Sequence, residues 1–251
     1  YDGTRYAGWQ RQENAISIQQ LLEENLHKIT GESVTIQGSG RTDSGVHAQA
    51  QIAHFDTGAR MPADKFAYAF NTGLPSDIRV IWSEEAPPGF HARFSAKRKH
   101  YRYTINNAAH ADALYGRYQL HVHAKLDVPA MAEAAAVLRG SHDFAAFKAV
   151  GTTVENTVRT LYDSRVTRTG DLILYDVVGS GFLYNMVRII AGTLIEVGKG
   201  KIPAARMGEI LNSLSRSEAG PTAPAQGLML MEVHYQERER RGSVDGAGLD
   251  A

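Results

Sequence analysis

Apolar residues recur at helical spacing in several stretches of the chain. In Ser17–Ile29 they lie three and four positions apart with polar residues between them, and Gly31 follows the stretch. An apolar stripe of this period predicts an amphipathic helix, and glycine is the residue that most often ends one. The same reasoning predicts four further helices, at Pro62–Asn71, Val128–Leu138, Phe182–Val197 and Ala204–Leu214.

Other stretches alternate apolar and polar residues with a period of two, which predicts half-buried strands. These are Ser33–Gln37, Gln49–Asp56, Ile78–Glu84, Lys99–Asn106 and Leu228–Tyr235, together with a hairpin over Val158–Val178 that turns at Arg168–Asp171. Helices separate the strands in both halves of the chain. The order therefore predicts two α+β units of similar pattern, joined around Ile105–Tyr118.

The composition excludes several classes of protein. The chain has 251 residues, 43% of them apolar, which is enough to bury a core in one large domain or two smaller ones. It has no cysteine, so a disulfide framework and a cysteine-ligated metal site are excluded and a cytoplasmic protein is favoured. No apolar stretch reaches the roughly 18 to 20 residues that span a bilayer, so we expect no membrane association.

We make two expectations about the ends of the chain. It begins at Tyr1 without a methionine and shows no signal-peptide pattern, so we expect that an upstream segment is missing. Residues 237–251 are charged and then small and glycine-rich, and we expect them to be disordered.

The charges balance at 27 basic and 27 acidic side chains, which by itself argues against a nucleic-acid partner. The balance hides a local excess, because Ala86–Ala111 contains five Lys or Arg and three His but no Asp or Glu. Aromatic residues are interleaved with these cations, a mixture that can contact phosphates and stack on bases. The stretch is compatible with a nucleic-acid surface or with a solvated, basic edge strand.

The segment from Gly38 to Ala48 is rich in glycine and carries Arg41 and Asp43 two positions apart. In an extended segment both side chains project to the same side, where the guanidinium would keep the carboxylate ionised. An ionised carboxylate on such a loop suits a nucleophile or a base, although a structural turn with a surface ion pair has the same spacing. A phosphate-binding P-loop is excluded, since no Gly-Lys-Ser/Thr follows.

Gly-Arg-Thr-Asp-Ser-Gly-Val-His-Ala at 40–48 resembles the signature of the TruA family of tRNA pseudouridine synthases. Further blocks resemble the family's other motifs in the same order, from residue 1 to about Tyr235. They are the segments 1–10, 90–96, 101–103, 143–144, 182–188 and 222–228. Two departures are an alanine at position 50, where a glycine is more usual, and the absence of the strand that should precede Tyr1.

The resemblance implies a role for individual residues. Asp43 falls on the family's catalytic aspartate, Tyr101 on the tyrosine that stacks on the target uracil, and Arg188 on the basic residue that pairs with the carboxylate. Arg41 falls on an arginine that touches the flipped nucleotide. Two segments correspond to tRNA contacts, namely Phe90, His91, Ala92, Arg93 and Phe94, and Gly151, Thr152, Thr153, Val154 and Glu155.

The resemblance also implies a fold, a reaction and partners. We expect an α+β protein of two ferredoxin-like (RRM-like) subdomains, 1–105 and 106–236. They would form a continuous, mostly antiparallel sheet with helices on one side and a basic catalytic cleft on the other. The implied reaction is the isomerisation of uridine to pseudouridine at positions 38, 39 and 40 of the tRNA anticodon stem-loop. A cytoplasmic homodimer that uses no metal or organic cofactor is expected.

The residue types suit this chemistry. The reaction needs a carboxylate, which Asp43 supplies, and a ring surface that holds the loose base, which Tyr101 supplies. Tyr101 is also a candidate for the base that removes the C5 proton. Arg188 and Arg41 would keep Asp43 charged in a pocket that the flipped base dries out.

Three alternatives have their own sequence arguments. The chain could be a non-catalytic RNA-binding module that keeps the fold. A glycosidase would need a second catalytic carboxylate near Asp43, and none is present in its loop. His121 with His123, and His47 with His54, could suggest a metal site. Two histidines two positions apart on a strand share a face, but without a nearby carboxylate or third ligand a polar strand surface is favoured, and we predict no catalytic metal.

Overall fold

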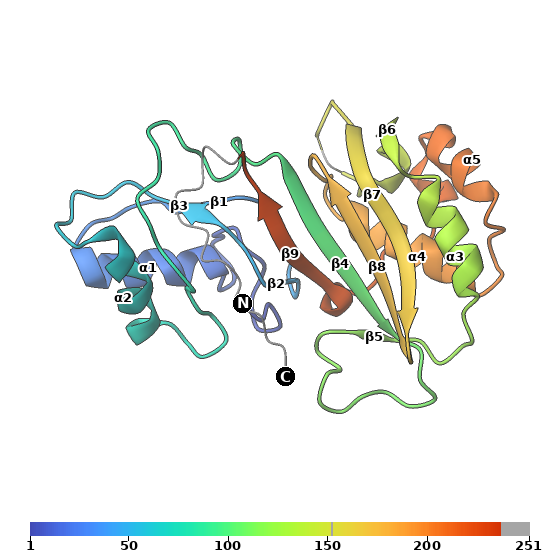
Figure 1. The fold of residues 1–251 in the computed structure, drawn as a ribbon, viewed down its shortest axis with the longest axis horizontal. Coiled ribbons are helices and arrows are strands. Elements are labelled where there is room, and N and C mark those ends of the chain that lie inside the picture. The colour runs from blue at the N-terminus through green and yellow to red at the C-terminus, as the bar shows by residue number, and fades with distance from the viewer. Residues whose placement is uncertain (152, 237–251) are drawn as a thin grey trace.

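The computed structural model describes residues 1–151 and 153–236. Its helices are α1 (Ile18–Thr30), α2 (Phe66–Gly73), α3 (Val128–Ala136), α4 (Met186–Gly198) and α5 (Arg206–Ser213), with short 3-10 turns η1 (Ala63–Lys65), η2 (Ala145–Phe147), η3 (Arg216–Glu218) and η4 (Ala225–Gly227). Its strands are β1 (Gln37–Gly38), β2 (His47–Ala48), β3 (Ala53–His54), β4 (Arg98–Asn106), β5 (Leu120–His121), β6 (Gly140–Asp143), β7 (Val158–Thr169), β8 (Leu172–Gly179) and β9 (Leu228–His234). In Figure 1, α1, α2 and the first short strands lie beside a larger half built on the long strands.

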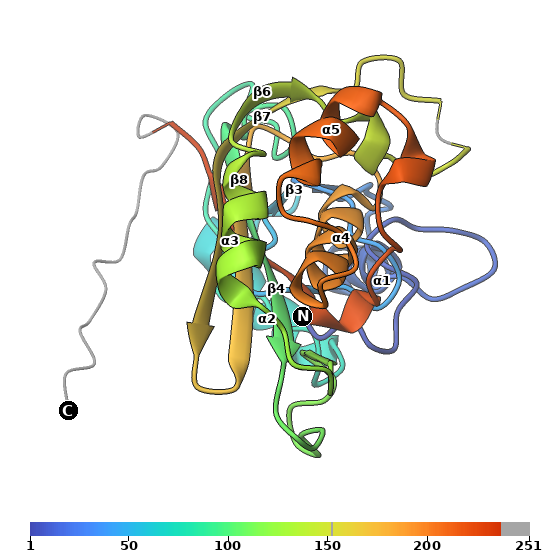
Figure 2. The same ribbon diagram turned by 90° about the vertical axis from the view of Figure 1, so that its right-hand side faces the viewer.

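A seven-stranded sheet organises the larger half. Its order is β2-β9-β4-β8-β7-β6, with β5 beside β4, and its pairs are antiparallel except β2 with β9 and β4 with β5. The predicted hairpin is confirmed as β7 and β8, and Gly170 at its turn has a left-handed φ of 57°. Seen edge-on in Figure 2, α3, α4 and α5 all lie on one side of these strands. The prediction of an α+β fold with a mostly antiparallel sheet is confirmed.

The first helix begins and ends where its sequence indicates. The Ser17 side chain accepts a hydrogen bond from the backbone N–H of Gln20, and Gly31 ends the helix with φ 77°. Ile18, Leu22 and Leu26 are buried in a core with Trp9 and Phe70. A second and larger core fills the space between the sheet and α3, α4 and α5. The expected boundary between subdomains near residue 105 stays a prediction.

The expected strand at Ile78–Glu84 is wrong, since no strand is assigned there. The side chain of Asn71 takes the place of a neighbouring strand: it donates to the carbonyl of Val80 and accepts from the N–H of the same residue. Burial does not follow the alternation either, since Ile78 is buried in the smaller core while Ile81 and Trp82, next to each other, are both exposed.

The other early strands are shorter than expected, and the sheet is not continuous. Only Gln37 of the predicted strand Ser33–Gln37 lies in β1, and only Ala53–His54 of Gln49–Asp56 forms β3. These two strands pair only with each other, as a separate two-stranded sheet among the described residues. The Gly38–Gly45 loop connects the two sheets, because it follows β1 of the small sheet and leads to β2 of the large one.

The helix predicted from Phe182 begins four residues later, at Met186. Asn185 has φ 61°, a left-handed conformation that cannot continue a helix, so the preceding residues form a turn. Within the described residues, no helix is both long enough and apolar enough to cross a membrane.

Candidate active site

Asp43 lies on the loop between β1 and β2 and is paired with a residue 145 positions away. Its Oδ2 accepts a hydrogen bond from Nη1 of Arg188 at 3.1 Å, and each side chain is 17% exposed. Arg188 is in the first turn of α4. The structure therefore brings together the carboxylate and the basic residue that the sequence assigned to each other.

The guanidinium of Arg188 is held in place by two further hydrogen bonds. Its Nε donates to the carbonyl of Ala223 at 2.8 Å, and its Nη1 also donates to Oδ1 of Asn185 at 2.9 Å. The left-handed turn at Asn185 directs that amide back onto the first helical turn. With these partners fixed, the orientation of Arg188 toward Asp43 is set by the fold before any substrate binds.

Burial raises the pKa of Asp43 above its ordinary value, and the hydrogen bond and charge of Arg188 oppose this shift. A carboxylate in this position is easier to protonate than one in water, so its pairing with Arg188 determines how much of it is ionised. Such a shifted carboxyl in a half-buried setting is typical of a functional site.

Arg41 does not take part in this pairing. Its side chain is exposed, and within the described part of the chain Asp43 has its ion pair with Arg188 alone. The expectation that Arg41 keeps Asp43 charged is therefore wrong. After Asp43 the loop makes a turn, in which the carbonyl of Asp43 accepts from the N–H of Val46.

Tyr101 lies on β4 and is 7% exposed. Its ring packs edge-on against Phe182 with centroids 5.1 Å apart. Burial raises the pKa of its hydroxyl, and the nearby charges of Tyr1 and Asp43 act in the same direction. Tyr101 and Asp43 are therefore close enough to interact electrostatically, as an active site that uses both requires.

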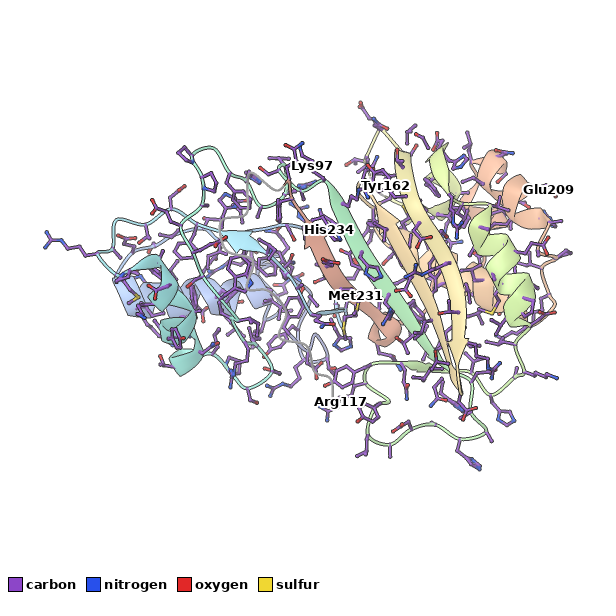
Figure 3. The ribbon with its side chains drawn as sticks, in the orientation of Figure 1. Lys97, Arg117, Tyr162, Glu209, Met231 and His234 are labelled. Carbon is purple, nitrogen blue, oxygen red and sulfur yellow. The ribbon has the colours of Figure 1, made fainter. Side chains whose placement is uncertain are left out.

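The basic stretch does not face a single cleft, because β4 distributes it over two faces. Lys99, Tyr101 and Tyr103 point toward the helices, and Tyr103 donates to the carbonyl of Pro224. Arg102 and His100 point to the other face, where both bind Asp176. The view of Figure 3 looks onto this second face, where Tyr162 and His234 are labelled, and Arg98 lies over the Tyr162 ring at 4.6 Å.

The position of the site relative to the helices also differs from expectation. Asp43 pairs with Arg188 on α4, and Tyr101 packs against Phe182 shortly before that helix, so the site lies on the sheet face that the helices cover and not on the opposite one. The reason is the phase of β4, which turns Tyr101 inward together with the apolar residues Tyr103 and Ile105.

The segment Phe90–Phe94 forms a turn with its own aromatic cluster. His91 stacks near Phe94 with ring centroids 4.2 Å apart, and Arg93 lies over the same ring at 5.7 Å. Phe90 packs on His54, and Ala92 is buried with its carbonyl bound by the Tyr235 hydroxyl. Phe94 is 73% exposed, so this turn presents an aromatic ring and a cation to solvent.

The segment Gly151–Glu155 is exposed where it is described, at Gly151, Thr153, Val154 and Glu155. Thr152 lies outside the described residues, as does the tail 237–251 that was expected to be disordered. Just before the segment, the N–H of Ala149 donates to the carbonyl of Tyr184, in the turn that leads into α4. The segment is thereby tied to the element that carries Arg188.

A set of contacts that the sequence did not reveal fixes the loop that carries Asp43. Gln51 donates to the carbonyl of Gly40 at 2.7 Å, Lys99 donates to that of Ser39, and the N–H of Trp9 donates to that of Thr42 at 3.1 Å. The Tyr1 hydroxyl meets Oγ1 of Thr42 at 2.7 Å. The position of Lys99 could have been predicted from the sequence, because it lies two positions before Tyr101 on an alternating strand and so shares the face of Tyr101.

Close packing of glycine adds to these anchors. A side chain at Gly8 would come within 2.2 Å of the carbonyl oxygen of Thr42, and Gly8 has φ 83°. Only glycine allows residues 8 and 42 to approach this closely. The segment 1–10, which resembles a family motif, therefore packs against the loop that carries Asp43.

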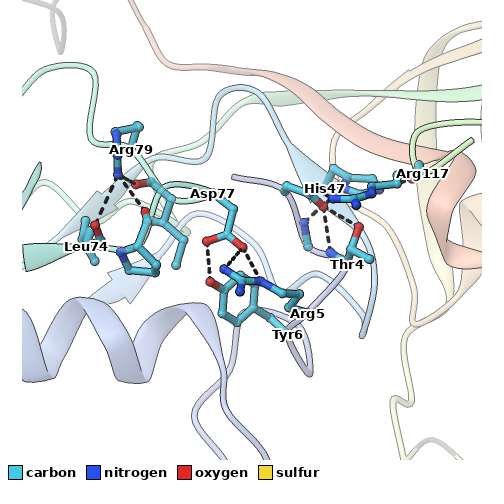
Figure 4. Close-up of polar contacts among 12 residues, drawn as sticks. Thr4, Arg5, Tyr6, His47, Leu74, Asp77, Arg79 and Arg117 are labelled. Carbon is cyan, nitrogen blue, oxygen red and sulfur yellow. Dashed lines mark hydrogen bonds and ion pairs between the residues drawn. The ribbon is translucent and has the colours of Figure 1, made fainter. Parts of the chain in front are cut away.

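The histidines considered as metal ligands have other partners. His47 is 1% exposed, accepts from the N–H of Gly3 and contacts the carbonyl of Arg117. His121 and His123 contact the carbonyls of Ala108 and Ala109. Throughout residues 1–151 and 153–236 there is no group of three or more His, Asp or Glu side chains arranged to hold a metal. Figure 4 shows Asp77 binding Arg5 and Tyr6, which fastens the first segment to the smaller core.

A half-buried carboxylate, paired with a fixed arginine beside an aromatic ring on an α+β sheet, is typical of a carboxylate-dependent enzyme. Comparison with known proteins gives the family. The family model described as tRNA pseudouridine synthase matches residues 1–95 and 134–236. The chain belongs to this family, whose members are isomerases.

Curated relatives are similar over almost the whole chain. A protein of Ruminiclostridium cellulolyticum named tRNA pseudouridine synthase A is 50% identical over 236 residues, which cover 94% of this chain and 96% of the relative. Proteins of the same name from Acetivibrio thermocellus and Brevibacillus brevis are 47% and 48% identical over 235 residues, with the same coverage of both chains.

Proposed function

We propose that this protein isomerises uridine to pseudouridine in tRNA, at positions 38, 39 and 40 of the anticodon stem-loop, with Asp43 as the catalytic carboxylate. The observation that carries the proposal is the half-buried pair of Asp43 and Arg188 beside Tyr101. The names of the relatives support tRNA as the substrate.

The reaction breaks the bond from N1 of uracil to C1′ of ribose, forms a bond from C5 to C1′, and releases the C5 proton, while N1 takes up a proton. Asp43 can attack C1′, attack C6, or take a proton from the sugar, and all three routes use an ionised carboxylate. Arg188 supports this role, because its hydrogen bond favours the ionised form against the effect of burial. Tyr101 stacks on the base while it turns, and is a candidate for the base that removes the C5 proton.

The target uridine must leave its stack to reach a half-buried carboxylate, which costs a few kcal/mol. Backbone contacts offset that cost, and the exposed groups around the site suit them. Arg41 projects into solvent from the catalytic loop, where it can contact the flipped nucleotide. Phe90, His91, Ala92, Arg93 and Phe94 make up one tRNA-binding segment in this proposal and Gly151, Thr152, Thr153, Val154 and Glu155 the other, in agreement with recognition through shape and phosphates.

The protein acts in this proposal as a cytoplasmic homodimer that needs no metal or organic cofactor. Sedimentation equilibrium of the purified chain, with and without tRNA, tests the dimer. A monomer in both conditions would contradict it. Unchanged activity after exhaustive chelation is the expected result for the cofactor claim.

Tritium release from uracil C5 in an unmodified tRNA transcript tests the reaction. We expect release from the full transcript and none when uridines 38, 39 and 40 are replaced by cytidine. Release that persists in the replaced transcript would place the target elsewhere. Binding of tRNA without any release would favour a non-catalytic RNA-binding module, and free uracil among the products would favour a glycosidase.

A further inference from the structure

Lys99 is a cation on the inner face of β4, two positions before Tyr101. Its partners on the neighbouring strands are Gly179 of β8 and Val233 of β9, neither of which carries a charge. Lys99 is not among the proposed catalytic residues, yet its charged side chain reaches the loop that carries Asp43.

The ammonium group of Lys99 donates to the backbone carbonyl of Ser39. Ser39 is fully buried, and its own N–H donates to the carbonyl of Ile52 at 2.7 Å. The next residue, Gly40, brings the loop against β4: a Cβ on Gly40 would lie 3.5 Å from Nζ of Lys99 and 3.7 Å from the Tyr101 hydroxyl. Lys99 thus joins the start of the loop to the strand that carries Tyr101.

Two neighbouring carbonyls of the loop, those of Ser39 and Gly40, are bound by different kinds of donor. The carbonyl of Gly40, one residue further on, is bound by the neutral amide of Gln51. A neutral donor therefore suffices to satisfy a carbonyl here, and a partly buried ammonium costs more to desolvate than an amide. A charged donor makes a stronger hydrogen bond, so a lysine is the better choice where the loop must be held firmly.

We propose that Lys99 is a positioning residue of the reaction: its ammonium group fixes the loop that carries Asp43 onto the strand that carries Tyr101. The inference rests on the proposed function, because it takes Asp43 and Tyr101 as the reacting groups. Lys99 acts through them and need not touch the substrate.

The charge on Lys99 depends on pH. Burial lowers the pKa of Lys99 to about 8, and the positive charge of Arg93 acts in the same direction. The titratable groups around it are Arg93 and, on its own strand, Tyr101, while Ser39, Gly40, Gly179 and Val233 carry none. The charged anchor is therefore present below pH 8 and is lost as the pH rises through that value.

As the pH rises and activity falls, the contribution of Lys99 to the free energy of unfolding must increase. In the unfolded chain Lys99 keeps its proton up to about its ordinary pKa of 10.5. Between pH 8 and 10.5 the unfolded state binds more protons at this site than the folded state, so this lysine contributes rising stability over that window. A lysine that only supported the fold would not make activity fall there.

The test compares Lys99→Met and Lys99→Arg with the parent, with Lys125→Met as a control at an exposed lysine. We expect Lys99→Met to lower kcat for tritium release by about 100-fold, the size of effect that a displacement of about 1 Å can produce, while KM for tRNA changes little. Lys99→Arg should restore most of the kcat, and Lys125→Met should match the parent.

The pH profile of kcat gives the second measurement. The parent should lose activity above about pH 8, and Lys99→Arg, whose guanidinium stays charged, should keep its activity to higher pH. This comparison decides the question even if Lys99→Met does not fold. Parental kcat in Lys99→Met, or the same loss above pH 8 in Lys99→Arg and the parent, would overturn the proposal.

The two proposals fail in different ways. If the parent releases no tritium, or Asp43→Asn releases it at the parental rate, the proposed function is wrong. If the parent is active and Asp43→Asn is inactive, but Lys99→Met is as fast as the parent, only the role of Lys99 is wrong.

Discussion

The two faces of β4 carry the same kinds of residue in different settings. On the inner face, Lys99 and Tyr101 approach the loop of Asp43, where the carboxylate has its arginine on α4. On the outer face, His100 and Arg102 are both bound to Asp176, which is 3% exposed at its side chain. Aromatic and basic residues are therefore not sufficient evidence of a nucleic-acid surface. The alternation of side chains along β4 determines which of them face the site and which face the buried carboxylate of Asp176.

Among the residues around Asp43, replacement of Arg188 by methionine should give the largest effect. It removes the partner of a half-buried carboxylate, and the pKa of Asp43 should rise further above its ordinary value. We expect kcat/KM to fall by about 10³-fold at neutral pH, which corresponds to the loss of a partly buried ion pair. The rate of tritium release, measured against pH, checks this.

The acid limb of that profile separates a change of charge from a general disruption. If Asp43 is the group that must be ionised, the limb should move to higher pH in Arg188→Met. An unchanged limb would mean that another group controls the activity.

Tyr101→Ala should give the next largest effect. Stacking of an aromatic side chain on a base contributes about 1 to 3 kcal/mol, so the variant should lose roughly 10- to 100-fold in kcat/KM. Tyr101→Phe retains the ring and separates the two roles of this residue. Activity near the parent's in Tyr101→Phe would assign the removal of the C5 proton to another group, and equal losses in both variants would point to the hydroxyl.

On the outer face of β4, Asp176→Asn should lower the stability of the fold and leave kcat unchanged. Burial works against the ionised form, yet the hydrogen bonds from His100 and Arg102 lower the pKa of Asp176 overall. The variant should therefore lose about 2 kcal/mol in the free energy of unfolding at pH 7, as measured in urea.

The pH dependence has a definite sign, because a carboxyl with a lowered pKa stabilises the fold when it is ionised. The advantage of the parent over Asp176→Asn should be complete at neutral pH and should shrink as the pH falls below about 4. A large loss of kcat in a folded Asp176→Asn protein would show that the outer face takes part in catalysis.

Much of the fold was predictable from local pattern. The helix at Ile18–Thr30 and the hairpin of β7 and β8 have strong periodicity and clear end signals, and both formed within a residue or two of the predicted bounds. The strand expected at Ile78–Glu84 did not form, since Asn71 supplies its hydrogen bonds from a helix. A contact between a side chain and a distant backbone leaves no trace in local alternation.

The site was predictable where the sequence resembled known motifs and less so where tertiary geometry decides. Asp43 and Arg188 meet as expected, although 145 residues separate them. Arg41 could not be placed from its spacing to Asp43, because spacing along the chain does not show which distant cation the fold brings to the carboxylate, and here that cation is Arg188. The anchors Gln51 and Tyr1 carry no motif of their own, and only the folded loop shows what they hold.

Single-turnover tritium release by Asp43→Asn, with tRNA binding measured alongside, tests the central claim most directly. Asparagine has almost the same shape and can still contact Arg188, so the loop should stay in place while the carboxylate is lost. We expect tRNA to bind with the parental Kd and no tritium to be released. Release at the parental rate by Asp43→Asn would contradict the assignment of Asp43 as the catalytic carboxylate.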